Sequence, residues 1–448
     1  MPAPEELSRE LRAIVAEAQS ERRAASIAAA VVRGGVVVWA DAVGLADAEQ
    51  AVDATPDHQY RIGSITKTFT AVCVMQLRDE GKLKLEDRLD AHLDVRTFGD
   101  LTLRQMLSHG SGLQREIPGD VWETLEFPKS TVELLATLEE AEQVLAPGER
   151  WHYSNLAYIL LGEVVAALSG MPYEDYVEHR VLQPLGLTRT GFSPDEPVAL
   201  AYSVEPYSDV LRREPMLVER TGGIAAAGQL WSTVGDLCRW ASFLADPDPG
   251  VLAPEAIDLM TAVQTMADPY RWSLAWGVGL ALMRKDERIY CGHDGGMPGY
   301  LANVLIDRND KLGAAVLVNG ESVGPAELAL ELVEKTRERY PPEADGWRPG
   351  EPPPPELASA LGRWWSEGAE FIFRWHEGRL ETRWAEAPAW MPWTRFEPLD
   401  GDRFRTVFGR ERGELLRLVR DANGNVTRMY WATYPLSRTP EVTGGGLR

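Results

Sequence analysis

The stretch RIGSITKTFTAVCVMQL, from Arg61 to Leu77, places Lys67 three residues after Ser64, at the start of a run that is otherwise almost wholly apolar. The chain holds only seven lysines against 39 arginines, so a lysine at this point is unusual. Gly63 predicts a turn into a helix, and residues three positions apart share one face of a helix. The sequence therefore predicts that the hydroxyl of Ser64 has the amine of Lys67 as a neighbour.

This pair suits nucleophilic catalysis. A serine hydroxyl is a poor nucleophile until a neighbouring base takes its proton. Lysine can be that base if burial and nearby positive charge lower its pKa, whereas arginine stays protonated. The alternative is that Ser64 only caps the helix while Lys67 extends to the surface. Among 19 serines, however, this is the one Ser-x-x-Lys.

A second constellation lies in APGERWHYSNLAYILLG, where Tyr153 and Asn155 flank Ser154 just as a buried helix is expected to begin. A phenol held near a cationic amine can become a phenolate at modest cost, and an amide side chain can hold a substrate carbonyl. The alternative is that Ser154 or Asn155 merely caps the helix while Tyr153 packs beside Trp151.

The third constellation is YCGHDGGMPGY, where His293 sits on a predicted strand that leads into glycines. Glycine allows a ligand to approach the backbone, so the N–H of Gly296 can point at an oxyanion. Its alternative is a glycine-rich hairpin with an incidental histidine. Three such constellations in this order favour one catalytic site over three coincidences.

Composition excludes several classes of function. The chain of 448 residues is 44% hydrophobic and 25% charged, as in ordinary folded proteins, and its net charge of −22 argues against nucleic-acid binding. The N-terminus predicts an amphipathic helix and not a secretory signal, and no apolar run approaches the roughly 20 residues of a membrane span. We therefore expect a cytoplasmic protein with neither a nucleic-acid nor a membrane partner.

Metal and disulfide chemistry are not expected either. Neither His-Glu-x-x-His nor paired-cysteine spacing occurs among the seven histidines and three cysteines, and the cysteines stand apart in apolar settings: Cys73, Cys238 and Cys291. The sequence therefore predicts an enzyme without metal or other cofactor.

One domain boundary is clear in PPEADGWRPGEPPPP, residues 341–355, which has the composition of a linker. It predicts a catalytic domain over residues 1–340 and a second domain over residues 356–448. The second domain carries seven of the 15 tryptophans in short alternating runs broken by Gly, Asp-Gly and Asn-Gly. This pattern predicts a meander of antiparallel strands closed as a small barrel.

The large domain predicts an α+β fold. Apolar runs at residues 26–32 and 35–44 flank two glycines in the manner of a hairpin, and three further strand-like runs end the domain at residues 287–296, 300–308 and 311–319. Between these ends the periodicity is helical, as in TFTAVCVMQLRDEG and SNLAYILLGEVVAALSG. We expect an antiparallel sheet built from both ends of the domain, with a helical region inserted.

The series Ser-x-x-Lys, Tyr-x-Asn and His-x-Gly resembles the serine β-lactamase and penicillin-binding-protein superfamily. Tyr153 stands where class C β-lactamases, D-alanyl-D-alanine carboxypeptidases and their esterase and D-aminopeptidase relatives have tyrosine. The stretches LTLRQMLSHGSGL and GQLWSTVGDLCRW are also similar to this family. The resemblance covers roughly residues 27–332. Some relatives also carry a C-terminal lipocalin-like barrel, which fits the tryptophan-rich tail.

The resemblance implies a role for each residue of the site. Ser64 would attack the acyl carbon, Lys67 and Tyr153 would share the proton transfers, and Asn155 would hold the acyl side of the substrate. His293 stands where many relatives have lysine and would stabilise Tyr153 or the leaving group.

The backbone N–H groups of Ser64 and Gly296 would form the oxyanion hole. Class C β-lactamases carry Lys-Thr-Gly where this chain has His-Asp-Gly, which argues against antibiotic hydrolysis and favours the esterase and peptidase branch.

The predicted function is a serine hydrolase that forms an acyl-enzyme with an ester, amide or peptide, D-residue substrates among the candidates. Its partner is then a small-molecule or peptide acyl substrate, and the sequence predicts no oligomeric state. One alternative is a thioesterase that releases or cyclises nonribosomal peptides by acyl transfer. Another is a binding module with an inactive site.

A competing nucleophile is Ser322 in GESVG, which lies between a predicted strand and a predicted helix like the nucleophile of an α/β-hydrolase. That mechanism needs a histidine further along the chain, and the one histidine there is His376, beyond the linker. The sequence therefore favours Ser64.

Overall fold

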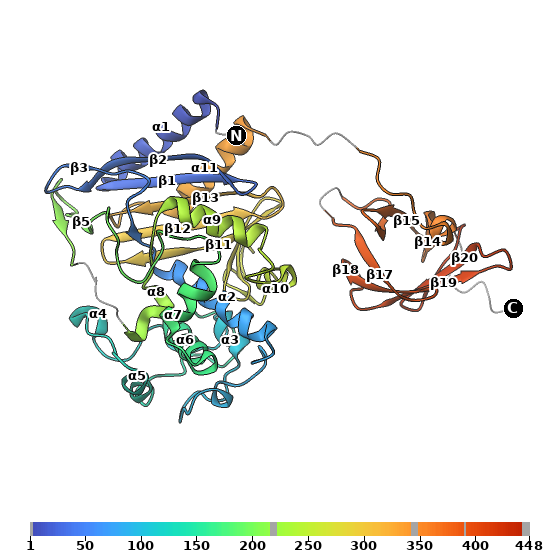
Figure 1. Cartoon of the computed structure of the whole chain (residues 1–448), viewed down its shortest axis with the longest axis horizontal. Coiled ribbons are helices and arrows are strands. Elements are labelled where there is room, and N and C mark those ends of the chain that lie inside the picture. Colours follow the sequence, from blue (N-terminus) through green and yellow to red (C-terminus); the bar gives the residue numbers. More distant parts are fainter. Residues whose placement is uncertain (1–2, 216–221, 342–347, 389–390, 441–448) are drawn as a thin grey trace. The chain divides into compact units, whose positions relative to one another are not determined.

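The computed structural model in Figure 1 describes residues 3–215, 222–341, 348–388 and 391–440. The chain divides into two compact units, Met1–Pro342 and Glu343–Arg448. Each unit has its own hydrophobic core.

The first unit is built on a nine-stranded antiparallel sheet with the order β3-β2-β1-β13-β12-β11-β10-β9-β8. The strands are β1 (Ser26–Arg33), β2 (Val36–Asp47), β3 (Val52–Asp53), β8 (Thr265–Met266), β9 (Leu274–Trp276), β10 (Ala281–Lys285), β11 (Arg288–Met297), β12 (Tyr300–Asp307) and β13 (Leu312–Val318). Strand β1 pairs with β2 on one side and with β13 on the other, from Ile27 opposite Val318 to Arg33 opposite Leu312. The prediction of a sheet made from both ends of the domain is confirmed.

Helices cover both faces of this sheet, as Figure 1 shows. Helices α1 (Glu5–Arg22) and α11 (Pro325–Arg339) pack on one face, where Ile27, Ala29 and Val31 of β1 point. The alternate residues of β1 face the main core, together with α2 (Thr66–Asp79), α6 (Asn155–Ser169) and α9 (Val234–Ala245). Because both faces are buried, β1 reads as a continuous apolar run instead of an alternating one.

The inserted region between β2 and β8 is largely helical and holds Ser64, Lys67, Tyr153 and Asn155 of the candidate site. Its remaining elements are the short helices η1 (Gly63–Ile65), η2 (Leu89–Ala91), α3 (Leu103–Leu107), α4 (Val121–Thr124), α5 (Thr131–Thr137), α7 (Tyr173–Val177), η3 (Glu178–Leu182), η4 (Gly222–Ile224), α8 (Ala225–Gly228) and α10 (Pro254–Met260), and the short strands β4 (Tyr60–Arg61), β5 (Tyr202–Val204), β6 (Leu211–Arg213) and β7 (Trp231–Ser232). Every residue of α2 from Thr66 to Leu77 is buried, so the predicted apolar surroundings of Lys67 are confirmed. No single helix of the described residues is long and apolar enough to cross a membrane, and the bent pair Asn155–Ser169 and Tyr173–Leu182 passes that test only when joined.

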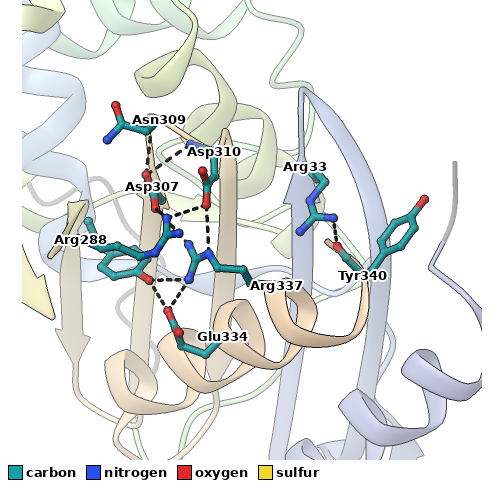
Figure 2. A network of polar contacts seen from close by, with 9 residues as sticks. Arg33, Arg288, Asp307, Asn309, Asp310, Glu334, Arg337 and Tyr340 are labelled. Atoms are coloured by element: carbon teal, nitrogen blue, oxygen red, sulfur yellow. Dashed lines mark hydrogen bonds and ion pairs between the residues drawn. The ribbon is translucent and has the colours of Figure 1, made fainter. Parts of the chain in front are cut away.

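A network of ion pairs fixes α11 to the sheet (Figure 2). Asp307, at the end of β12, accepts from Arg288 of β11 at 2.7 Å and from Arg337 of α11 at 3.0 Å. Asp310 accepts from the same two arginines at 2.6 and 3.0 Å, and Glu334 pairs with Arg337. The side chain of Asp307 is only 2% exposed, so its charge depends on these two arginines and on the backbone N–H groups of Asn309 and Asp310, which also donate to it.

The second unit is a nearly closed antiparallel barrel of eight strands in sequence order. The strands are β14 (Gly362–Ser366), β15 (Ala369–His376), β16 (Arg379–Trp384), β17 (Thr394–Asp400), β18 (Arg403–Phe408), β19 (Leu415–Arg420), β20 (Val426–Trp431) and β21 (Tyr434–Leu436). One bridge closes the ends of the sheet, with Trp365 N donating to Ser437 O at 2.9 Å and Ser437 N to Trp365 O at 3.0 Å. The predicted barrel is confirmed.

Part of the predicted linker lies outside the described residues, since residues 342–347 are not among them. Its last residue, Pro355, begins a 3₁₀ helix that runs to Ala360. Leu357 and Ala360 of this turn are buried in the barrel core with Trp364. Folded structure of the second unit therefore begins at the last proline of the proline-rich stretch.

Candidate active site

Ser64 and Lys67 meet at the junction of η1 and α2. Lys67 Nζ lies 3.0 Å from Ser64 Oγ and 2.6 Å from the carbonyl oxygen of Ala227 in α8. Gly63 precedes them with a positive φ of 49°, which turns the chain from β4 into the helix. The structure thus contains the predicted contact between the Ser64 hydroxyl and the Lys67 amine.

Burial lowers the pKa of Lys67 to about 7. The nearby carboxylate of Glu116 opposes this effect, and the guanidinium of Arg115 adds to it. A lysine with such a pKa is neutral in a large part of the molecules at neutral pH, so its lone pair can accept the proton of Ser64.

Tyr153 lies beside Ser64 and Lys67. Lys67 Nζ lies 5.1 Å from the centre of the Tyr153 ring, and Ser64 is close enough to the Tyr153 hydroxyl to lower its pKa. Burial nevertheless raises the pKa of Tyr153 above its usual range, and the nearby Ser64 side chain offsets this only in part. The expectation that Tyr153 ionises at modest cost is therefore wrong for the free protein, because desolvation outweighs the positive charge of Arg115.

Ser154, and not Asn155, caps helix α6, since its side chain accepts a hydrogen bond from the backbone N–H of Ala157. Asn155 is free for another contact: its Nδ2 donates to Oε1 of Glu116 at 2.6 Å. Asn155 lines the same cavity as Ser64 and Gly296. Sequence reasoning placed Asn155 in the site but not its carboxylate partner.

His293 is buried on β11, with its ring centre 6.1 Å from that of Tyr153. Its Nδ1–H donates to the backbone carbonyl of Asp294, so the ring offers Nε2 as an acceptor, and Nε2 has no partner among the described residues. Burial and the charge of Lys67 lower the pKa of His293 to about 3. A neutral histidine cannot supply the positive charge that a lysine would bring to this position.

Gly296 follows on the same strand, and β11 packs against η1. A Cβ placed on Gly63 would stand 2.6 Å from the amide nitrogen of Gly296, so the two backbones are in direct contact. Ser64 and Gly296, whose amides are proposed for the oxyanion hole, line the same cavity.

Three residues of the site were missed by sequence reasoning: His109, Arg115 and Glu116. His109 adopts a positive φ of 55°, accepts from Ser154 N at 3.1 Å, and stacks 4.2 Å from the ring of Tyr153. Arg115 lies over the Tyr153 ring, with its guanidinium carbon 4.9 Å from the ring centre. All three lie in or just after the stretch LTLRQMLSHGSGL, so this stretch was the available signal.

Ser322 lies between β13 and α11, as predicted, but it has no catalytic neighbours. Its hydroxyl donates to the backbone carbonyl of Arg22, and no histidine contacts it within the described parts of the chain. This contact ties the loop to the end of α1, which is a structural role.

The described residues contain no group of three or more histidine, cysteine or acidic side chains placed to hold a metal ion. The three cysteines are free and buried, and burial raises the pKa of each thiol: Cys73, Cys238 and Cys291. The absence of a cofactor stays a prediction.

The fold combines an antiparallel sheet built from both ends of the domain with an inserted helical region, and a Ser-x-x-Lys pair lies at the entrance to that region. This combination defines the β-lactamase class of folds. The chain belongs to the Beta-lactamase family, whose model matches residues 11–337. Residues 353–438 match a domain of unknown function, DUF7586, which here forms the nearly closed barrel. The kinship of this barrel to lipocalins stays a prediction.

Known relatives share modest identity. Beta-lactamase-like protein 2 of Dictyostelium discoideum is 28% identical over 273 residues, or 56% of this chain, and the match spans only 48% of that protein. The octameric penicillin-binding protein homologue from Pyrococcus abyssi superposes with a TM-score of 0.66 at 25% identity, covering 96% of this chain and 99% of that one. A D-stereospecific amidohydrolase from Streptomyces sp. gives 0.63 at 25% identity, covering 74% and 98%.

Proposed function

We propose that this protein is a serine hydrolase that works through an acyl-enzyme on Ser64. The observation that carries the proposal is the contact of 3.0 Å between Ser64 Oγ and the amine of a buried lysine. Neutral Lys67 takes the hydroxyl proton as Ser64 Oγ bonds to the substrate carbonyl carbon. One N–H of the amine is held by the Ala227 carbonyl, which orients the lone pair toward Ser64.

Tyr153 then acts as the second proton carrier. Because it is a neutral phenol beside Ser64, its O–H can protonate the leaving group as the bond to the acyl carbon breaks. Lys67, now protonated, returns a proton to Tyr153. The backbone N–H groups of Ser64 and Gly296 bind the negative oxygen of the intermediate. Water completes the cycle by attacking the acyl carbon, with the same groups used in reverse.

An amide, ester or peptide is the proposed substrate class. The similarity to a D-stereospecific amidohydrolase supports amides and makes D-residues part of the substrate panel. Transfer of the acyl group to an amine would use the same acyl-enzyme. Product analysis with p-nitrophenyl esters, D-amino-acid amides and peptidyl thioesters, each with and without an added amine, distinguishes hydrolysis from transfer.

The test of the proposal is covalent labelling with a fluorophosphonate probe, read by intact mass. We expect the wild type and Ser322→Ala to be labelled once, and Ser64→Ala to be neither labelled nor active. Labelling that stays in Ser64→Ala and disappears in Ser322→Ala would overturn the proposal. A wild-type protein that is never labelled would favour the binding-module alternative.

A further inference from the structure

The segment that carries Tyr153 has no regular structure of its own. Residues 151–154 form neither helix nor strand, and helix α6 begins only at Asn155. Tyr153 must nevertheless keep its hydroxyl beside Ser64, because a proton carrier works only within hydrogen-bond reach of the atoms it serves. The position of the phenol therefore depends on contacts from other parts of the chain.

His109 makes three of these contacts. Its backbone carbonyl accepts from His152 N at 2.8 Å, and its ring Nδ1 accepts from Ser154 N at 3.1 Å. These two hydrogen bonds hold the residues on either side of Tyr153. The His109 ring also lies against the ring of Tyr153, with 4.2 Å between the ring centres and 30° between the planes. One residue thus fixes the backbone around Tyr153 and one side of its phenol ring.

The backbone at His109 favours a different residue. His109 N donates to Met106 O at 3.3 Å and Gly110 N donates to Gln105 O at 2.8 Å, which are the two hydrogen bonds of a Schellman motif at the end of α3. The residue in the left-handed turn of this motif is usually glycine, but here it is His109, with a φ of 55° and a fully buried side chain. Exceptions to local preference are expected at functional sites.

The ring of His109 is a support and not a second base. Because Nδ1 accepts from a backbone N–H, it carries no hydrogen, and the neutral ring has its hydrogen on Nε2. Burial and the nearby charge of Lys67 lower the pKa of His109, which favours this neutral form. The lone pair of Nδ1 is thus used by Ser154.

We propose that His109 is a positioning residue that holds the Tyr153 hydroxyl where it can protonate the leaving group. This inference rests on the acyl-enzyme function proposed above. As the bond from the acyl carbon to the leaving atom breaks, its electron pair passes to that atom, which takes the Tyr153 proton. A misplaced phenol therefore slows the reaction only for leaving groups that need the proton. A stable anion such as p-nitrophenolate departs without it.

The test uses butyrate esters that share one acyl group and differ in their leaving group: p-nitrophenol, phenol and trifluoroethanol. A pH indicator follows acid release from all three and gives kcat/KM, which covers the steps up to acylation. His109→Gly keeps the left-handed turn and removes the ring. In this variant we expect kcat/KM for the trifluoroethyl ester to fall by at least about 10²-fold, the scale of lost general-acid catalysis, and that for the p-nitrophenyl ester to change little. Tyr153→Phe should show the same pattern.

Two further variants separate positioning from packing. His109→Asn should recover part of the loss, because the asparagine oxygen takes the place of Nδ1 and asparagine also tolerates a positive φ. His58→Gly is the matched control, since His58 is also buried and its Nδ1 accepts from Thr55 N at 3.1 Å. It should affect the three esters equally. Each comparison is a ratio within one protein sample, so partial misfolding leaves it unchanged.

Equal losses for the three esters in His109→Gly would leave His109 a purely structural role and overturn the inference, and so would unchanged rates. Fluorophosphonate labelling distinguishes this result from failure of the proposed function, which fails if Ser64 of the wild type is not labelled and no ester reacts. If Ser64 is labelled but the esters do not react, phosphonates with the same leaving groups replace them. Intact mass measures their bond to Ser64 without turnover, and the same outcomes decide.

Discussion

Gly63 lies directly against the peptide of Gly296, and a Cβ added to Gly63 would stand 2.6 Å from the amide nitrogen and 2.7 Å from the carbonyl oxygen of Gly296. The segment before the nucleophile and the strand opposite it therefore touch through bare backbone. Any side chain at Gly63 would push the two amides of the proposed oxyanion hole apart.

Gly63→Ala should lower the acylation rate by about 10²-fold, the scale of losing one oxyanion donor. Gly81→Ala is the matched control, because Gly81 also has a positive φ, 72°, but its Cβ would meet nothing within 4 Å. Both variants carry backbone strain, and only the first displaces Gly296. Burst kinetics with a chromogenic ester measure acylation, and equal losses in the two variants would contradict the proposed hole.

Lys67→Arg should fold but lose acylation by about 10²-fold or more, the usual scale for removing a general base. Arginine keeps the positive charge but does not give up its proton. Lys82→Arg, at an ion pair with Glu80 on the surface, is the control and should react normally. After folding is checked by circular dichroism, near-normal acylation in Lys67→Arg would identify Lys67 as a charge partner instead of a base.

The acylation rate should rise with pH around 7. The pKa of Lys67 is lowered to about 7, and the neutral amine is the active form, so the rate is half-maximal near pH 7 and falls as the pH drops and Lys67 becomes protonated. His293 has a pKa lowered to about 3, so it is neutral throughout this range. The rise of the acylation rate with pH around 7 should therefore persist in His293→Ala. Its disappearance from the pH profile of that variant would assign the titration to the histidine.

Asp307→Ala should destabilise the first unit by about 2 kcal/mol, because it removes the buried carboxylate that Arg337 and Arg288 share, while Asp310 still pairs with both arginines (Figure 2). Asp258→Ala breaks the ion pair with Arg308 on the surface and should cost less than about 1 kcal/mol. Urea unfolding followed by tryptophan fluorescence measures both. Similar effects in the two variants would mean that the network does not hold α11 on the sheet.

Local spacing explains why part of the site was predictable. Ser64 and Lys67 lie within one helical turn, so their contact follows from the sequence once the helix is assigned. The sheet was predictable for a similar reason, since β1, β2 and β11 to β13 are apolar runs bounded by turn residues. The alternating runs of the second unit predicted the barrel, but the bridge between Trp365 and Ser437 joins residues far apart in the chain, and no local pattern predicts that pairing.

Glu116 and the ionisation of Tyr153 were not predictable for another reason. The partner of Asn155 lies in an irregular loop 39 positions away, where neither periodicity nor capping applies. Charge partners alone predicted an easily ionised Tyr153, but burial decides its pKa, and burial depends on packing by His109 and Trp276 from separate segments. The resemblance to a family identified the residues of the site. Their protonation states depend on burial, which follows only from the packed structure.

The pairing of β1 with β13 also has a consequence for synthesis of the chain. Ile27 leaves the ribosome long before Val318, its partner in the sheet. At about 5–20 residues per second, the first hairpin waits on the order of tens of seconds with one edge unpaired. An apolar strand in that state is prone to pair with other chains. Newly made molecules should therefore depend on chaperones until translation reaches β13, and any product that stops before Leu312 should aggregate.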